Sequence, residues 1–122
     1  TKYKLLKHYL PGPFTFILNA SNEVPKYFDS NKKEIGIRIP NNEITLEIVR
    51  LLGNPLATSS LHNDEDEIQE YFSNPTVIYE CFSDKIDFII DGGVGKLEPS
   101  TIIDCSSGVA QVIRQGLGIF EN

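Results

Sequence analysis

Hydroxyl and guanidinium groups are the side chains of this 122-residue sequence whose grouping points to chemistry. The hydroxyls form four groups, around Thr15, at residues 58–60, at residues 100–101 and at residues 106–107. Arg38 and Arg114 lie in or at the ends of expected strands, each two residues from a glycine. Guanidinium forks pair with carboxylates and phosphates, and hydroxyls both donate and accept hydrogen bonds. These residue types suit a site that binds anions.

Several well-known kinds of catalytic and metal site are missing from the sequence. It contains no G-x-S-x-G, no H-E-x-x-H and no paired-cysteine zinc motif. The glycines at residues 92–95 are followed by Lys96-Leu97, whereas a P-loop needs Ser or Thr after its Lys. The acidic run at residues 63–67 is typical of a solvated helix start. We therefore expect no metal ligands and no catalytic side chain.

Other positions leave two interpretations open. Arg38 shares a strand face with Gly36, so it is either a solvent-facing side chain or an anion ligand with space beside it. Arg50 lies three residues after Glu47, which favours a surface ion pair within a helix. His62 is either an exposed loop residue or part of a pocket. The groups at Thr15, residues 58–60 and residues 100–101 could converge with the arginines at one sheet edge.

The elements that must position these groups alternate between strands and helices. Aromatic and β-branched residues predict strands at 14–18, 35–40, 86–91, 100–105 and 109–114, with a short one beginning at 56–57. Helices are expected to end near residue 10, to run over 43–52 from an Asn42 cap, to start in the acidic run, and to cover 75–82 as an amphipathic segment. Residues 106–108 favour a hairpin turn. This order predicts a single α/β domain with a mixed sheet.

Composition limits the partners and the compartment. The net charge of −6 argues against strong nucleic-acid binding by a generic basic surface. No apolar run approaches 18 residues, and the charged start is not typical of a signal peptide, so neither a membrane span nor secretion is expected. Cys81 and Cys105 lie in apolar surroundings, which predicts buried free thiols in a reducing, cytoplasmic setting.

Five ordered segments resemble the YrdC/YciO family, whose best-known members are threonylcarbamoyl-AMP synthases. They are PGPFTFIL at residues 11–18, GIRIP at 36–40, PLATSS at 55–60, DFIIDGG at 87–93, and PSTIID at 99–104 followed by IRQG at 113–116. The resemblance implies a twisted, mixed α/β sheet of the YrdC/RibB-like kind. For the full-length domain it implies a nucleotidyltransferase-type reaction of L-threonine, bicarbonate and ATP. That reaction yields threonylcarbamoyl-adenylate, which serves modification of adenosine 37 in tRNA.

The resemblance also assigns ligands residue by residue. It implies that Thr15, Ser60 and Arg114 contact the nucleotide, and that Arg38, Thr58 and Ser100 contact the threonine. His62 and Thr101 are further candidates without an assigned ligand. A magnesium ion is expected with the ATP phosphates.

Two features separate the sequence from the synthases that it resembles. The family's amino-terminal portion, which carries a Lys-x-Arg pair, is not matched, so residues 1–122 resemble the carboxy-terminal part of one domain. His62 stands where the synthases have Asn, which is closer to the YciO-like branch. We expect this portion to be inactive alone and to self-associate through a truncated sheet edge. The alternatives are a double-stranded RNA or tRNA-binding module without catalysis, and an α/β domain whose loops are merely polar.

Overall fold

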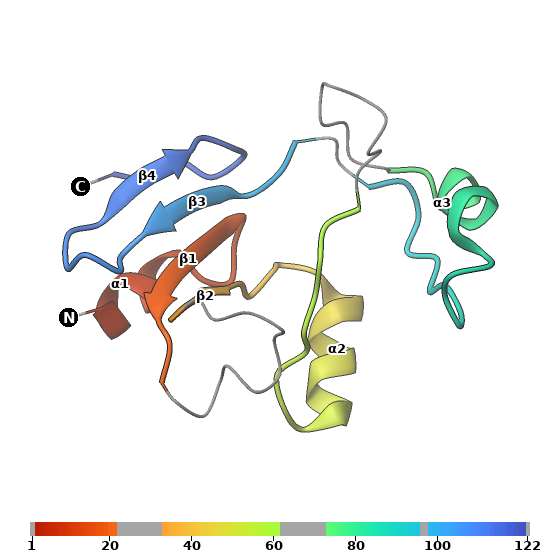
Figure 1. Ribbon diagram of the computed structural model, residues 1–122, viewed down its shortest axis with the longest axis horizontal. Coiled ribbons are helices and arrows are strands. Elements are labelled where there is room, and N and C mark those ends of the chain that lie inside the picture. The colour runs from red at the N-terminus through yellow and green to blue at the C-terminus, as the bar shows by residue number, and fades with distance from the viewer. Residues whose placement is uncertain (1, 22–32, 62–72, 96–97, 122) are drawn as a thin grey trace. The chain divides into compact units, whose positions relative to one another are not determined.

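The computed structural model describes residues 2–21, 33–61, 73–95 and 98–121 and contains seven regular elements (Figure 1). The helices are α1 (Lys2–Tyr9), α2 (Glu43–Leu52) and α3 (Pro75–Phe82). The strands are β1 (Phe14–Asn19), β2 (Glu34–Ile37), β3 (Thr101–Asp104) and β4 (Gln111–Arg114). Contacts divide the chain into two compact units, Thr1–Ala57 with Ser100–Asn122, and Thr58–Pro99. No helix in the described ranges is long and apolar enough to cross a membrane.

The first unit is built on a four-stranded mixed sheet with the order β2-β1-β3-β4, which confirms the predicted fold class. The central strands β1 and β3 are parallel, and Phe14 pairs with Thr101. The outer strands β2 and β4 are antiparallel to their neighbours. The amino ends of β1 and β3 therefore meet the carboxyl ends of β2 and β4. We call this side, with Thr15, Ser100 and Arg114, the Ser100 end of the sheet.

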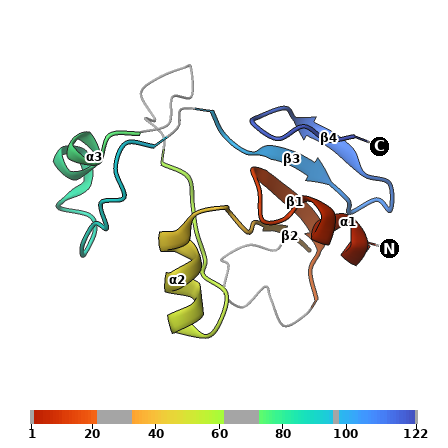
Figure 2. The same cartoon turned by 180° about the vertical axis from the view of Figure 1, so that it is seen from behind.

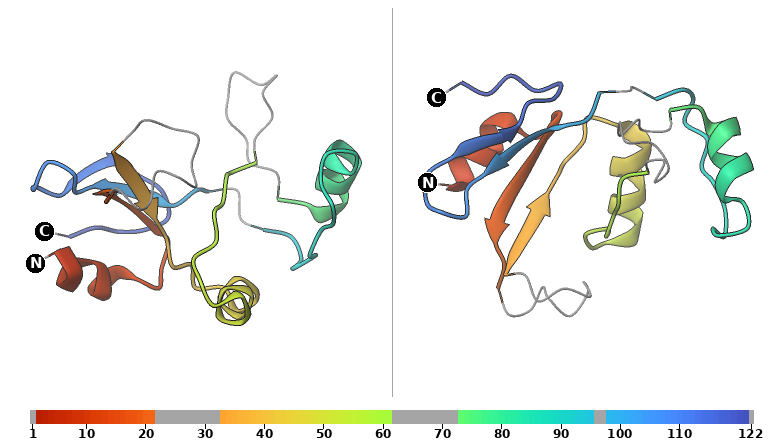
Figure 3. Two further views of the ribbon diagram at one scale, coloured as in Figure 1. Left: turned by 60° about the horizontal axis from the view of Figure 1, so that its bottom comes forward. Right: turned by 45° about the horizontal axis from the view of Figure 1, so that its top comes forward.

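One face of this sheet is buried and carries the core. Alternate residues of a strand point to the same face, so Phe14 and Phe16 join Thr101, Ile103 and Cys105 on the buried side. The structure covers that face with α1 and the C-terminal segment (Figures 2 and 3). The side chains that pack there from outside the strands are Leu5, Leu6, Tyr9, Leu10, Ala110 and Phe120.

Tyr9 joins the two segments that cover the core. Its ring lies 4.9 Å from the ring of Phe14 and 5.0 Å from that of Phe120, measured between centroids. Its hydroxyl donates to the carbonyl of Glu121 at 2.7 Å and accepts from the Glu121 N–H at 3.1 Å. The polar tip of a mostly apolar side chain thereby fixes the C-terminal segment against α1.

Helix α2 has the ends that its sequence predicts. The Asn42 side chain accepts a hydrogen bond from the Thr45 N–H at 3.0 Å, which satisfies one of the free donors at the helix start. Gly53 adopts the left-handed conformation with φ of 81° and closes the helix through its N–H. The predicted pair of Glu47 and Arg50 forms on the exposed surface. Local signals therefore suffice for this element.

The predicted strands at 56–57 and 86–91 are wrong, because neither stretch forms a strand. A strand needs a hydrogen-bonded neighbour, and the described sheet contains no partner for either stretch. Phe88 and Ile90 are instead 76% and 55% exposed within the second unit. After this stretch the Gly93 N–H donates to the Asp91 side chain at 2.8 Å.

Other boundaries and one burial prediction also change. The strand predicted over 35–40 ends at Ile37 because the next residues turn away to pair the Ile39 carbonyl with the Gly12 N–H at 2.9 Å. The strand predicted over 109–114 begins at Gln111. Cys105 is buried as expected, but Cys81 is exposed, since α3 buries none of its residues. The helix predicted from the acidic run lies outside the described residues.

Candidate functional site

Thr15 and Ser100 lie side by side at the Ser100 end of the sheet because β1 and β3 are parallel and in register there. Their side-chain oxygens are 2.6 Å apart, and either hydroxyl can be the donor. Thr15 lies between the buried residues Phe14 and Phe16, so alternation directs it to the opposite face of the sheet. Ser100 directly precedes β3 and is 8% exposed. The pair is a small, partly buried cluster of hydrogen-bonding oxygens.

Arg114, the last residue of β4, completes this cluster. Its Nε donates to the Ser100 carbonyl at 3.1 Å and its Nη2 to the same oxygen at 2.8 Å. Nη2 also lies 3.3 Å from the Ser100 hydroxyl. The backbone carbonyl thus holds the guanidinium in one orientation, beside the Ser100 hydroxyl, which in turn contacts the Thr15 hydroxyl. A fixed cation next to hydroxyl groups is suited to binding an anionic oxygen.

Arg38 reaches the same end of the sheet from the other side. β1 pairs antiparallel with β2 so that Phe16 faces Ile37. Thr15 precedes Phe16 and Arg38 directly follows the end of β2, so both lie at this end of the sheet. Arg38 is exposed, and no described residue makes a hydrogen bond or ion pair with its guanidinium. The topology thus places Arg38, Arg114, Thr15 and Ser100 at one end of the sheet, whereas residues 58–60, which were predicted to converge with them, belong to the second unit.

Gly36 has no side chain that could fill the space beside Thr15. A Cβ atom added at Gly36 would lie 3.3 Å from Cγ2 of Thr15, and no other atom would come within 4 Å. The glycine therefore leaves open space on the face that carries Thr15, which agrees with either interpretation of Arg38. Any larger side chain there would press on the Thr15 side chain.

Charge is separated along the length of the sheet. Arg38 and Arg114 lie at the Ser100 end, whereas Glu34 and Asp104 lie at the other ends of β2 and β3. The Ser106 hydroxyl donates to Asp104 at 2.6 Å and the Ser106 N–H at 2.9 Å. These bonds, the hydroxyl first, hold the pKa of Asp104 below its usual value. The acidic groups of these two strands therefore stay at the far end from the cationic groups.

Thr101 is fully buried and its hydroxyl is used within the protein. It donates to the Gly118 carbonyl at 2.7 Å and accepts from the Gly116 N–H at 3.0 Å. The turn that it holds follows Arg114, and the sequence interpretation gave this turn no role. Two glycines at positions 116 and 118, directly after a predicted strand, were the feature of the sequence that could have indicated this turn.

The remaining predicted site residues belong to the second unit or lie outside the described part. Thr58 and Ser60 are exposed and belong to an extended stretch without regular structure. Near them, the Ser59 hydroxyl approaches the Ser60 carbonyl at 3.5 Å. His62 lies outside the described residues. The roles that resemblance gave to these three residues remain predictions.

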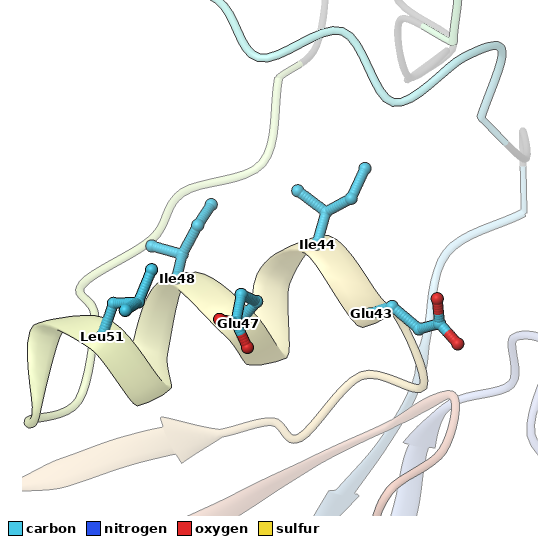
Figure 4. A pocket seen from close by; sticks show the side chains of 5 residues that line it. All are labelled: Glu43, Ile44, Glu47, Ile48 and Leu51. Carbon is cyan, nitrogen blue, oxygen red and sulfur yellow. The ribbon is translucent and has the colours of Figure 1, made fainter.

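A shallow apolar depression lies along α2, and none of the residues predicted as ligands lines it (Figure 4). It is lined by Glu43, Ile44, Glu47, Ile48 and Leu51. Ile44, Ile48 and Leu51 point to the same side of the helix. The depression contains no hydroxyl or guanidinium group, so it does not share the chemistry of the Ser100 end.

The described residues do not fit a resident magnesium site. No group of three His, Cys, Asp or Glu residues among them is arranged to hold a metal ion. The donors at the Ser100 end are hydroxyls and guanidinium groups, and a guanidinium repels a cation. This part of the chain thus offers ligands for an anion.

Comparison with known proteins gives one family for nearly the whole chain. The model of the Sua5/yciO/yrdC family, described as "Telomere recombination", matches residues 1–116. An uncharacterized protein of Haemophilus influenzae is 37% identical over 121 residues, which are 97% of this chain and 57% of that protein. YciO of Escherichia coli K12, also described as uncharacterized, is 35% identical over 95% of this chain and 56% of its own length. A threonylcarbamoyl-AMP synthase of Pyrococcus abyssi is 31% identical over 92% of this chain and 32% of its own.

Solved structures give the same relationship. The crystal structure of E. coli YciO matches with a TM-score of 0.85 and 34% identity, over 96% of this chain and 56% of that one. P. abyssi Sua5 complexed with L-threonine matches with a TM-score of 0.80 and 29% identity, over 94% of this chain and 33% of that one. The chain thus spans a little over half the length of the first curated relatives that it matches.

Proposed function

The chain belongs to the Sua5/YciO/YrdC family, and from this premise we propose that its Ser100 end forms part of a threonine and nucleotide site of the threonylcarbamoyl-AMP synthase type. The observation that carries the proposal is the contact of Thr15, Ser100 and Arg114 at the ends of three strands. Family relationship supports the choice of ligand, because a P. abyssi relative was solved with L-threonine.

Direct contact between residues assigned to different ligands suits the proposed product. Thr15 and Arg114 are proposed to contact the nucleotide and Ser100 the threonine, yet Ser100 touches both of the others. Threonylcarbamoyl-adenylate joins the threonine-derived carbamate to the α-phosphate of AMP, so its two halves meet at one bond. Residues for the two halves must then also be neighbours. Arg38, with its exposed guanidinium, is proposed to pair with the threonine carboxylate.

The proposed chemistry needs binding and alignment more than a reactive side chain. The threonine amine adds to bicarbonate with loss of water, and a carbamate oxygen then attacks the α-phosphorus of ATP, so that pyrophosphate leaves. Hydroxyl and guanidinium donors stabilise negative charge on the phosphate oxygens and hold the reactants close. Magnesium is proposed as part of the ATP substrate complex.

Isothermal titration calorimetry of the 122-residue chain tests this proposal. L-Threonine and magnesium-ATP are titrated into the wild type, Ser100→Ala and the control Ser107→Ala, whose position is exposed. We expect Ser100→Ala to weaken threonine binding by about tenfold, because a hydrogen bond to a charged group is worth roughly 1.5–3 kcal/mol. Ser107→Ala should bind like the wild type. If neither L-threonine nor magnesium-ATP binds to the wild type at millimolar concentration, the proposal is contradicted.

Catalysis by this portion alone is not expected. The chain spans 56–57% of its first relatives, and the residues proposed on it are substrate ligands, none of which is proposed as a reactive side chain. We expect binding without formation of threonylcarbamoyl-adenylate or pyrophosphate by the purified chain. Pyrophosphate release that depends on threonine, bicarbonate and ATP together would overturn this expectation.

RNA binding is the second candidate that the sequence raised, and the charge disfavours it. The chain carries a net charge of −6, and phosphate-backbone binding depends on lysine and arginine contacts. A gel shift with tRNA at two salt concentrations separates the two proposals. Retention that falls steeply as salt rises would favour an RNA-binding module, whereas no retention agrees with the small-molecule site.

A further inference from the structure

Thr101 occupies a position between the candidate site and the turn that follows Arg114. Its backbone belongs to β3 and its N–H donates to the Pro13 carbonyl at 2.9 Å, so the strand fixes the neighbouring Ser100 as well. Its side chain points to the buried face, with 0% exposure, away from the face that carries Thr15. One residue thus contacts the site through its backbone and the core through its side chain.

The Thr101 hydroxyl connects both ends of the turn at residues 116–118. It accepts from the Gly116 N–H at 3.0 Å and donates to the Gly118 carbonyl at 2.7 Å, so it uses both its donor and an acceptor lone pair. Gln115 adds a second donor, since its Nε2 lies 2.7 Å from the same Gly118 carbonyl. Valine has the shape of threonine and would leave the Gly116 N–H without this partner.

The turn at residues 115–118 directly follows Arg114 in the sequence. Arg114 is the last residue of β4, and only Gln115 separates it from Gly116. Its guanidinium makes two hydrogen bonds to the single carbonyl of Ser100, an arrangement that tolerates little rotation of the backbone that carries it. Loss of the brace should therefore loosen the guanidinium before it loosens the sheet.

We propose that Thr101 is a positioning residue, whose buried hydroxyl braces residues 116 and 118 and thereby holds the Arg114 guanidinium on Ser100. The inference that this matters for ligand binding rests on the proposed function. The structural part of the inference stands without it. Each part has its own measurement.

Nitrogen-detected or proton–nitrogen NMR of arginine Nε–H groups tests the structural part. The chain has three arginines, so the Nε–H signal that disappears in Arg114→Lys is assigned to Arg114. In the wild type the Arg114 signal should be dispersed and protected from exchange. Thr101→Val should move it to the position of a solvated arginine, Thr101→Ser should preserve it, and the exposed Thr76→Val is the matched control. A Thr101→Val protein with dispersed amide signals and an unmoved Arg114 signal would overturn the proposal.

A second variant keeps this test decisive if Thr101→Val does not fold. Gln115 is exposed, so Gln115→Ala should fold, while it removes one of the two donors to the Gly118 carbonyl. We expect its Arg114 signal to shift in the same direction as in Thr101→Val, but by less. An Arg114 signal identical to the wild type in Gln115→Ala, together with an unfolded Thr101→Val, would also overturn the proposal.

A double-mutant cycle on magnesium-ATP affinity tests the functional part. Thr101→Val should weaken binding by about tenfold in the wild-type background and by less than about twofold in Arg114→Lys, because it acts through that guanidinium. Equal losses in both backgrounds would indicate a general structural role and contradict positioning. If the wild-type chain binds no ATP, the proposed function fails, and the NMR result still decides whether Thr101 positions Arg114.

Discussion

Ser100 is the residue on which the candidate site depends, since its two oxygens contact both Thr15 and Arg114. The sequence alone singled out these residues, because hydroxyls and guanidinium groups near expected strand ends are visible without coordinates. It could not predict that Ser100 and Arg114 touch. The contact depends on a one-residue shift in the pairing of β3 with β4, between Ile102 and Ile103.

Gly36 is the residue that keeps the ligand side of Thr15 clear. We expect Gly36→Val to weaken threonine and ATP binding by about tenfold, because the new side chain would push Thr15 off its hydrogen bond with Ser100. Calorimetry measures the effect, and urea unfolding confirms that the sheet is intact, since valine suits a strand. Gly95→Val, where the nearest atom to an added Cβ is 3.8 Å away, is the control. Unchanged affinity in Gly36→Val would show that this space is not used.

Asp104 should give the sheet a dependence on pH. Hydrogen bonds from Ser106 lower its pKa in the folded state, so its contribution to stability is complete above the unfolded pKa, near 3.8, and is lost as pH falls through the folded value. Asp104→Asn should therefore lower the urea midpoint at pH 7. The difference from the wild type should shrink below about pH 3.8, which unfolding curves at pH 7 and pH 3 measure. An equal difference at both values would exclude titration of this carboxyl as the cause.

At the scale of elements, predictions succeeded where short-range chemistry defines the structure. Asn42 and Gly53 fix the ends of α2, and both act within one turn of the helix. Residues 86–91 have the apolar, β-branched composition of a strand but form none. Composition reports how a stretch would behave in a sheet, and it does not report whether a partner strand is present. The four paired strands come from residues far apart, so their order also required coordinates.

The segment after β4 is held by a close contact that a single methyl group should break. A Cβ atom at Gly118 would lie 2.6 Å from the Phe14 ring, which is buried in the core. We expect Gly118→Ala to destabilise the fold by about 1–3 kcal/mol, the usual cost of overpacking, as measured by urea unfolding. Gly95→Ala should be nearly neutral, because the nearest atom there is 3.8 Å away. A neutral Gly118→Ala would mean that the C-terminal segment can move away from Phe14.

At the scale of the whole molecule, much apolar side-chain surface remains exposed in the described ranges. Leu51 of α2 and Phe88 of the second unit are 71% and 76% exposed. Surfaces of this kind are typical of interaction sites or of aggregation. The expected self-association, first inferred for the sheet edge, therefore has a second source in these side chains.

Light scattering tests this expectation on the 13.7 kDa chain. The apparent mass should rise with concentration, and Leu51→Glu should reduce that rise by placing a charge in the apolar depression of α2. Ser107→Glu, at an exposed position, is the control for the change in net charge alone. A monodisperse monomer over the whole concentration range would contradict self-association by either surface.

The parallel pairing of β1 with β3 also has a consequence for synthesis on the ribosome. The hydroxyls of Thr15 and Ser100 are 85 residues apart in sequence. At about 5–20 residues per second, roughly 4–17 seconds pass between the translation of one and that of the other. During that interval the aromatic residues of β1 lack the strand that buries them, so the nascent chain should be a substrate for chaperones that bind exposed apolar segments. The cluster of Thr15, Ser100 and Arg114 can assemble only after residue 114 has been translated.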